Sequence, residues 1–269
     1  MSNVTNFTGT IRLSSAGANG DKWNVPGVNA PGAALVIDDG SQLFVYNPAA
    51  SFGGGISLIG TGNNENRGAI RLDGPLGGNI TLAGSATIGS ENGSLSGNIA
   101  SGAAGTQILT VGTVNSTGDA TFSGNIGGGV GVIALTKTAA GTLTLTGTNT
   151  YNTATTVNGG TLLLAAGCLF TTNGFWTVAD GVGLVGAVTV NAGASATCSG
   201  ALIGASQGTG TLILNGGTVH VTDQLTLALG DTGAGNTLGT VTVNSGTLAV
   251  NWLQVGILYV GGSDFTATL

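Results

Sequence analysis

The sequence predicts an all-β protein built as a solenoid, in which short strands recur coil after coil. Three observations carry this prediction: apolar and hydroxyl-bearing residues alternate in short segments, asparagine and glycine recur at intervals, and charge is scarce. The 269 residues include 52 glycines but only 4 prolines, and 6% are charged. Threonine is a good strand former, while glycine and asparagine make corners. The composition therefore favours stacked β structure over collagen or disorder.

The first 50 residues differ from the remainder and are expected to form an irregular N-terminal cap. Trp23 and three of the four prolines fall in this range, around strand signals at 34–37 and 43–46. A solenoid needs a cap, because an uncovered end offers unpaired backbone to another chain. We therefore divide the sequence into a cap or irregular β segment at 1–50 and the solenoid proper at 51–269.

Further strand signals lie at 56–59 and 69–72, on either side of the most hydrophilic segment of the chain, residues 61–67. From Gly77 onward the triplet Gly-Asn-Ile recurs, and its asparagines are 19 and 27 residues apart. The three triplets occupy residues 78–80, 97–99 and 124–126.

A second unit recurs in the C-terminal half and consists of a strand, Asn-x-Gly and another strand. Its asparagines are 33, 24 and 29 residues apart, at Asn158, Asn191, Asn215 and Asn244. Periods of this length indicate a solenoid with loops of variable length, and Asn-x-Gly can turn a strand because both residues tolerate positive φ. The pairs Asn158-Gly159 and Asn215-Gly216 also suit tight antiparallel hairpins, which is the structural alternative.

Residues 132–164 combine these features most clearly. Strand signals lie at 132–135, 142–146 and 155–164, the last broken by Asn158, and Leu143 alternates with threonines. The stretch contains Leu-Thr-Lys-Thr, then Thr-Leu-Thr-Leu-x-Gly-x-Asn-Thr-Tyr, then Thr-Thr-Val-Asn-x-Gly-Thr-Leu. It resembles the passenger-associated β-strand repeat of bacterial autotransporters, departing from it where Ala139 and residues 152–154 replace glycines.

This resemblance covers about 33 of the 269 residues. It implies a right-handed single-stranded parallel β-helix, for which the coil length predicts about ten to twelve coils. It also implies an extracellular setting on a bacterial cell surface.

Charge and hydropathy exclude several classes of function. The net charge is −6, which argues against nucleic acid, and no cation follows Lys137, which argues against anionic ligands in the C-terminal half. No apolar run reaches the ~18 residues that a membrane span requires. The first residues lack the pattern of a secretory signal, so an excised fragment and another export route both stay open.

No set of residues predicts catalysis, a cofactor or a metal. Ser206 lies in a Gly-x-Ser-x-Gly motif, but a strand rather than a helix is expected after it, and no acid separates it from His220, the only histidine. We expect His220 to face solvent, because it alternates with two valines. The acids Asp38-Asp39 and the pair Asp223 and Asp231 do not suit paired-carboxylate chemistry.

Calcium at the loop of Glu65 or at residues 231–236 is the metal alternative, although the nonapeptide repeat of calcium-binding β-rolls is absent.

The cysteines and aromatic residues leave alternatives open. Cys168 and Cys198 are 30 residues apart, so they could pair across neighbouring coils, but two buried free thiols are the preferred interpretation. Two cysteines and one histidine cannot supply a closed zinc site. Aromatic residues gather in two groups: Phe170, Phe175 and Trp176, and then Trp252 and Tyr259. They are expected either to fill the core or cap an end, or to form a platform on which sugars stack.

The sequence thus predicts a non-catalytic structural protein of the cell exterior: a surface stalk, an adhesin passenger or a fibre-forming subunit. One alternative is a filament that assembles head to tail through the end at 257–265, which shows little sign of a charged cap. The other is a polysaccharide-binding or depolymerising β-helix of tailspike type. The expected partners are accordingly the chain itself and surface glycans.

Overall fold

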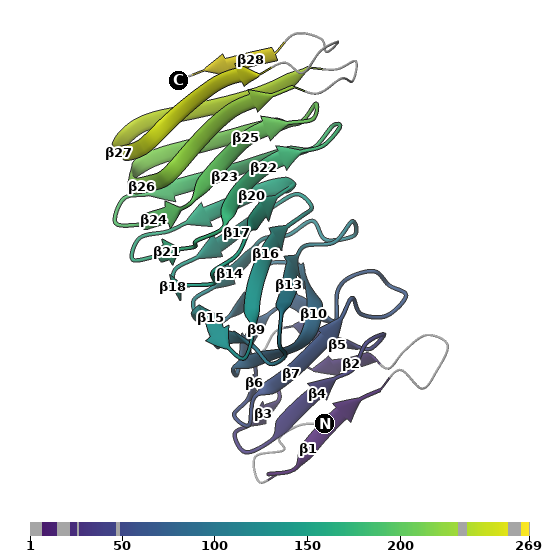
Figure 1. The fold of residues 1–269 in the computed structure, drawn as a ribbon. Helices are drawn as coiled ribbons and strands as arrows, with labels where there is room; N and C mark the ends of the chain where they lie inside the picture. Colours follow the sequence, from purple (N-terminus) through teal and green to yellow (C-terminus); the bar gives the residue numbers. More distant parts are fainter. Residues whose placement is uncertain are drawn as a thin grey trace. The chain divides into compact units, whose positions relative to one another are not determined.

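In the computed structural model the chain is an all-β parallel solenoid of about ten turns (Figure 1). The structure describes residues 7–14, 22–25, 27–46, 49–230, 236–257 and 265–268, and no helix occurs among them. The described strands pair in parallel register. The solenoid prediction is therefore confirmed, and the antiparallel hairpin alternative is wrong.

The chain divides into two compact units, Met1–Ala134 with Thr138–Leu143 and Leu135–Lys137 with Thr144–Leu269. Two strands contribute residues to both units: β16 (Val132–Lys137) and β17 (Thr142–Leu145).

The first unit consists of short strands: β1 (Thr10–Leu13), β2 (Lys22–Val25), β3 (Asn29–Ala30), β4 (Ala34–Ile37), β5 (Gln42–Tyr46), β6 (Ala50–Phe52), β7 (Ile56–Gly60), β8 (Ile70–Asp73), β9 (Pro75–Gly77), β10 (Ile80–Ser90), β11 (Gly93–Leu95), β12 (Ile99–Ser101), β13 (Thr106–Val111), β14 (Ala120–Phe122) and β15 (Ile126–Gly129). They stack in three ladders. One runs β1–β4–β7–β10–β12–β15, the second begins β2–β5–β8–β10, and the third runs β3–β6–β9–β11–β14.

The second unit continues with β18 (Thr148–Asn149), β19 (Thr155–Val157), β20 (Gly159–Leu164), β21 (Leu169–Thr171), β22 (Phe175–Asp180), β23 (Val185–Asn191), β24 (Ser195–Cys198), β25 (Gly200–Ala205), β26 (Thr209–Leu229), β27 (Thr237–Ile257) and β28 (Phe265–Thr268). β20 and β23, β21 and β24, and β22 and β25 form three ladders that all continue onto β26. β26 and β27, 21 residues each, pass through all three faces and pair along their lengths.

Most strand signals lie where the sequence places them. β4, β5, β7 and β8 match the predicted positions within one residue at each end, and the break at Asn158 separates β19 from β20.

The range 1–50 contains regular ladder strands in its described part. β1, β2 and β3 pair in register with β4, β5 and β6, and the third ladder crosses residue 50 without interruption. Trp23, expected in an irregular cap, lies in β2, with its ring 5.9 Å from that of Phe52 in an edge contact. The described residues of this range are thus turns of the solenoid.

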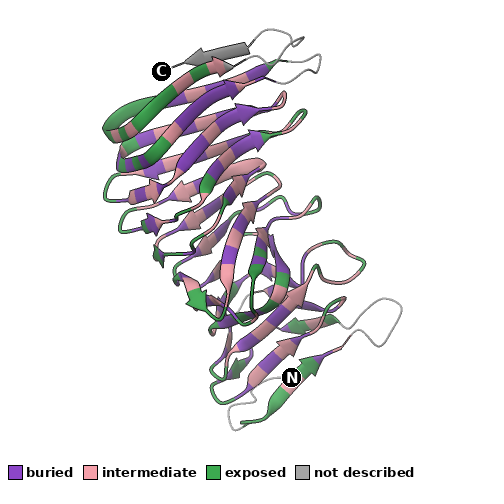
Figure 2. Cartoon of the chain, viewed as in Figure 1, coloured by how far each residue is buried: buried purple, intermediate pink, exposed green. Residues whose placement is uncertain are grey.

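The core is made of columns of inward side chains. In the second unit Leu162, Val188, Leu212 and Val241 are successive register partners, and each is at most 2% exposed. Figure 2 shows the corresponding alternation of buried and less buried residues along the strands. Each turn covers the one before it, so every turn adds buried apolar surface. This burial stabilises the fold by about 25 cal/mol per Å².

The Gly-Asn-Ile triplets mark one stacked corner of the first unit. The backbone N–H of Asn98 donates to Asn79 Oδ1 at 3.0 Å, and that of Asn125 donates to Asn98 Oδ1 at 2.8 Å. The following isoleucines are register partners, as Ile80 is for Ile99. Each part of the triplet therefore has a role: glycine permits close approach, asparagine bonds to the next turn, and isoleucine fills the core.

The Asn-x-Gly units do not all occupy one corner. Asn191 is paired with Asn215, and Asn244 Nδ2 donates to Asn215 Oδ1 at 2.8 Å. Asn158 instead follows Val157, whose register partner is Val178 of a different ladder. The fourfold repeat inferred from the sequence is therefore wrong for its first member, because similar letters stand at two different corners.

Substitution of Gly97 tests how closely two turns approach each other. A Cβ added there would lie 1.8 Å from the carbonyl oxygen of Gly78. We expect Gly97→Ala to lower the free energy of unfolding by about 3 kcal/mol, because the backbone must shift. Gly105→Ala is the control: its φ is +80° and nothing lies within 4 Å of the added Cβ, so only conformational strain of about 1 kcal/mol is expected. Denaturant unfolding measures both variants, and an equal loss of unfolding free energy in the two would contradict the steric argument.

Candidate functional site

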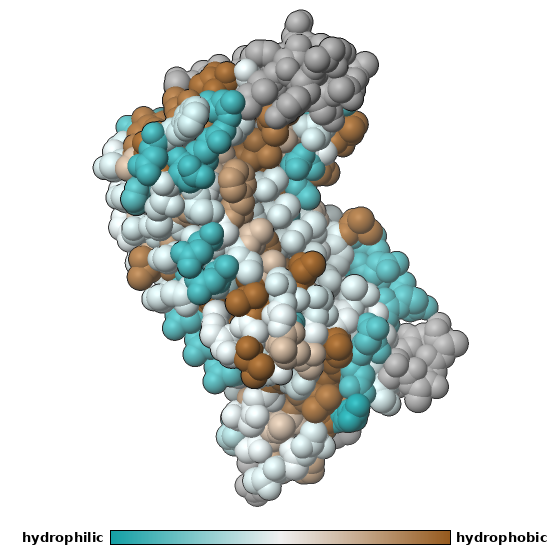
Figure 3. Space-filling view, viewed as in Figure 1, coloured by the Kyte–Doolittle hydropathy of each residue, from teal (hydrophilic) through white to brown (hydrophobic). Residues whose placement is uncertain are grey.

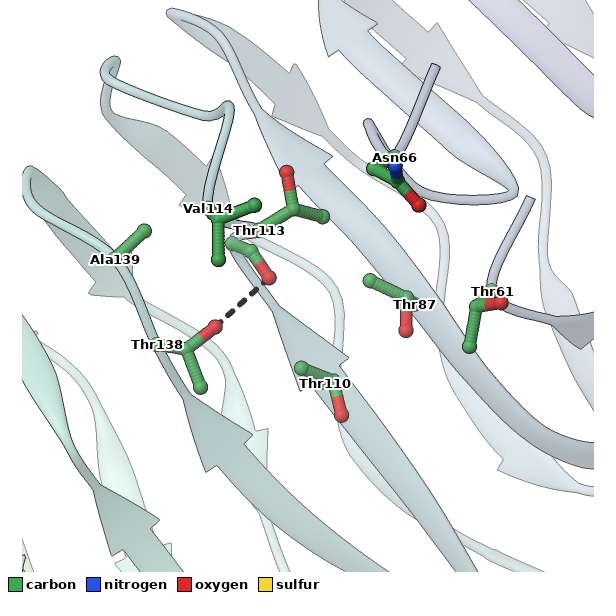
Figure 4. A pocket seen from close by; sticks show the side chains of 9 residues that line it. Thr61, Asn66, Thr87, Thr110, Thr113, Val114, Thr138 and Ala139 are labelled. Carbon is green, nitrogen blue, oxygen red and sulfur yellow. Dashed lines mark hydrogen bonds between the residues drawn. The ribbon is translucent and has the colours of Figure 1, made fainter. Parts of the chain in front are cut away.

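A groove lined largely by threonines lies in the first unit. It encloses about 400 Å³, and Figure 4 shows its lining side chains. The lining residues are Thr61, Asn66, Thr87, Thr110, Gly112, Thr113, Val114, Thr138 and Ala139.

The ladder positions these side chains. Thr87 of β10 and Thr110 of β13 are register partners, so their hydroxyls lie on adjacent turns of the same face. Thr138 Oγ1 donates to the carbonyl oxygen of Gly112 at 2.8 Å (Figure 4). Asn66 and Ala139 have φ of 54° and 63°, so both bend the backbone at the groove.

The groove offers hydroxyl and amide groups beside methyl groups, and its lining residues include no titratable side chain. This chemistry suits a neutral ligand that donates and accepts hydrogen bonds. It gives no general acid or base to the groove itself.

A cluster of ion pairs in the first unit joins residues that are far apart in the sequence. Lys22 Nζ lies 2.5 Å from Glu65 Oε1, and Arg71 Nη2 lies 3.2 Å from Glu91 Oε2. Arg67 also pairs with Glu91, and Arg71 Nη1 lies 3.8 Å from Glu65 Oε2. The sequence alone does not reveal this cluster, because only the turns of the solenoid bring β2, β8 and the segment after β10 together.

This cluster bears on the calcium alternative at Glu65. The Glu65 carboxylate already faces two cations, and the Arg71 guanidinium lies 4.1 Å from the ring centroid of Phe44. A site that binds cations needs uncompensated acidic oxygens. Across the described residues, no group of three or more His, Cys, Asp or Glu could hold a metal ion. The other candidate calcium site is the segment 231–236. Its residues 231–235 lie outside the part of the chain that the structure describes.

The motif around Ser206 lacks the local structure of a nucleophile elbow. Ser206 and Gln207 form a turn with φ of 47° and 67°, and strand β26 begins at Thr209. An elbow requires a helix at that point. His220 lies in β26 and is exposed, as its alternation with Val219 and Val221 predicts.

The acids Asp38 and Asp39 follow the end of β4. Asp38 accepts two hydrogen bonds from Arg12, and Asp39 Oδ1 accepts one from the N–H of Gly40. Asp223 is exposed, and its proposed companion Asp231 lies outside the described residues.

Most of the first aromatic group fills the core. Phe170 is 0% and Trp176 1% exposed, with ring centroids 5.3 Å apart in an edge-to-face contact. Tyr151 packs edge-on against Phe170 at the same distance. The sugar-platform alternative is therefore wrong for Phe170 and Trp176, whereas Phe175 is 40% exposed. In the second aromatic group, Trp252 is 66% exposed and Tyr259 lies outside the described residues.

Lys137 is a buried cation that was not predicted from the sequence. It occupies an inward position of β16, is 0% exposed, and is the register partner of Val157. Its Nζ donates to the carbonyl oxygen of Gly159 at 3.2 Å. The alternation Leu135-Thr136-Lys137 could have revealed it, because the residue shares a face with Leu135.

Lys137→Ala is expected to lower the free energy of unfolding by about 3 kcal/mol, because it leaves a cavity in the core. Lys137→Met fills that space and gives up the polar interactions of the ammonium group, including the hydrogen bond to Gly159, so its loss should be smaller, about 1 kcal/mol. Denaturant unfolding of both variants measures the difference. If Met were as damaging as Ala, the ammonium group rather than packing would stabilise this position.

Cys168 and Cys198 are buried free thiols, which confirms the interpretation preferred from the sequence. They lie on adjacent turns but not opposite each other, because the register pairs Phe170 with Ala196 and Thr171 with Thr197. Burial raises the pKa of the Cys168 thiol to about 11 and that of Cys198 to about 12.

These thiols should resist labelling in the folded protein at pH 8 and react fully in denaturant. Because their folded pKa values exceed the ordinary value of about 8.5, the unfolded chain releases its thiol protons first as the pH rises. The contribution of the thiols to stability is therefore complete below about pH 8.5 and decreases as the pH rises toward about 12. Cys198→Ala should reduce this alkaline loss in pH-dependent unfolding. An unchanged loss would assign it to other groups.

The described part of the chain contains no helix that is long and apolar enough to cross a membrane. Comparison with models of protein families found no match, and comparisons with curated proteins and with solved structures found none either. The structure shows a parallel β-solenoid. The resemblance of residues 132–164 to the autotransporter repeat stays a prediction.

Proposed function

We propose that the chain is a non-catalytic structural β-helix of the cell exterior, serving as a surface stalk, an adhesin passenger or a fibre-forming subunit. The observation that carries this proposal is the stack itself, in which inward apolar columns run through successive turns of the second unit. Such a stack stabilises an extended surface without needing a particular ligand.

The character of the surface supports a structural role. Intermediate hydropathy predominates in the space-filling view, with strongly hydrophilic and strongly hydrophobic residues scattered among it (Figure 3). Outward threonines of neighbouring turns lie in register, as Thr136 does with Thr156 and Thr156 with Thr177. Like charges at such close spacing would repel, so a low charge content suits a tightly stacked surface.

The repeat at residues 132–164 supports the cellular setting. Its resemblance to autotransporter passengers makes a bacterial cell surface the proposed location, with surface glycans and the chain itself as proposed partners. The net charge of −6 supports the view that nucleic acid is not a partner.

An assay for sugar release tests the non-catalytic part of the proposal. The purified chain is incubated with acidic and neutral polysaccharides, and newly formed reducing ends or unsaturated products are measured against heat-denatured protein. No release above that control is expected. Release that saturates with substrate and disappears on unfolding would overturn the proposal in favour of a depolymerising β-helix.

The groove favours a second candidate, non-catalytic binding of a neutral glycan, because its hydroxyl and amide groups can bond to sugar hydroxyls. A glycan array is the first measurement. For any glycan bound, Thr110→Val should weaken binding about five- to tenfold through loss of one hydrogen bond. Thr211→Val is the matched control, since Thr211 is also half-buried but does not line the groove. Equal effects of the two variants would exclude the groove as the site.

A further inference from the structure

The loop of residues 61–67, which follows β7 and precedes β8, forms one side of the threonine groove. Thr61 and Asn66 belong to this loop, and both line the groove. Figure 4 shows them across the groove from Thr138 and Ala139. The contacts that fix the 61–67 loop therefore also fix two polar side chains of the groove.

Ion pairs connect this loop to other turns of the solenoid. Glu65 Oε1 lies 2.5 Å from Lys22 Nζ of β2, and Glu65 Oε2 lies 3.8 Å from Arg71 Nη1 of β8. Arg67 pairs with Glu91, which follows β10. Opposite charges therefore hold both Glu65 and Arg67 of the loop.

Phe44 positions the two cations that Glu65 contacts. Its ring centroid lies 5.4 Å from Lys22 Nζ and 4.1 Å from the central guanidinium carbon of Arg71. Phe44 and Arg71 are register partners in β5 and β8, and the negative face of an aromatic ring attracts a cation. The strands thus place both cations without the loop, and the Glu65 carboxylate attaches the loop to them.

A hydrogen bond extends the influence of Glu65 to a second loop. Asn115 Nδ2 donates to the backbone carbonyl oxygen of Glu65 at 3.0 Å. Asn115 directly follows Thr113 and Val114, which also line the groove. A displacement of Glu65 therefore affects the lining residues of both loops.

We propose that Glu65, Lys22 and Arg71 form an ionic latch, which holds the 61–67 loop at the groove and makes the shape of this uncharged groove depend on ionic strength. The Glu65 and Lys22 side chains are 33% and 28% exposed, so dissolved ions screen their attraction. When salt opens the latch, Thr61 and Asn66 leave the groove. The proposal rests on the glycan binding proposed for the groove and adds its regulation.

Limited proteolysis with trypsin tests the latch without a ligand. The chain contains five lysines and arginines, and cleavage after Arg67 requires the loop to leave its place because Gly68 is buried. Raising the salt from ~0.05 M to ~1 M, where the Debye length is about 3 Å, should speed this cleavage about tenfold. A peptide substrate corrects for the effect of salt on trypsin. An unchanged rate of cleavage after Arg67 would overturn the latch.

Two amide variants assign the effect to Glu65. Glu65→Gln keeps the shape of the side chain without its charge, so at low salt it should be cleaved as fast as the unmodified chain at high salt. Asp119→Asn is the matched control: Asp119 is exposed, and its Oδ1 accepts a hydrogen bond from the N–H of Thr142 that an amide oxygen can also accept. It should keep the salt dependence.

Circular dichroism and thermal unfolding of the two amide variants establish that they fold, and the salt series on the unmodified chain does not depend on them. If both folded variants keep the salt dependence of cleavage, or both lose it, the assignment to Glu65 is wrong.

Binding distinguishes the latch from the glycan function on which it rests. For a neutral glycan from the array whose binding Thr110→Val weakens, the affinity should fall about tenfold between the two salt concentrations, because two lining side chains are lost. Glu65→Gln should bind as weakly at low salt. Binding to the groove that is constant with salt would contradict the regulation. An array on which no glycan binds would remove the glycan function alone, and the proteolysis then decides the latch.

Discussion

Parallel stacking in strict register is the constraint on which the rest of this structure depends. Adjacent strands lie about 4.8 Å apart, so every side chain contacts the residue at the same position one turn away. Apolar residues must then fall on apolar residues, which produces columns such as Leu162, Val188 and Leu212. The same spacing leaves no room for a Cβ where Gly97 approaches Gly78.

Charge is restricted by the same geometry. A charged residue repeated in a column would repel its neighbours, so the ion pairs of the first unit combine both signs across several turns, around Glu65, Arg71 and Glu91. Lys137 is the exception in the core of the second unit, where its ammonium group donates to a backbone carbonyl. Polar bonding between turns is carried mainly by neutral groups, as the asparagine ladder through Asn79, Asn98 and Asn125 illustrates.

A structure stabilised turn by turn is free to vary its outward residues and its loops. The threonine groove depends on this freedom, because bends at Asn66 and Ala139 shape a concave site beside otherwise regular strands.

The sequence by itself determined the class of fold, most strand positions and the inward alternation of apolar residues, because these depend on local periodicity. It also identified the Gly-Asn-Ile intervals that became the asparagine ladder, and it placed His220 in solvent. Only the tertiary structure decided which corner each asparagine occupies, that Lys137 is buried, and that Lys22, Glu65 and Glu91 meet. The physical reason is that turns here differ in length, as the 19- and 27-residue intervals between the ladder asparagines show. Similar letters therefore do not fall in the same column until the register between whole turns is known.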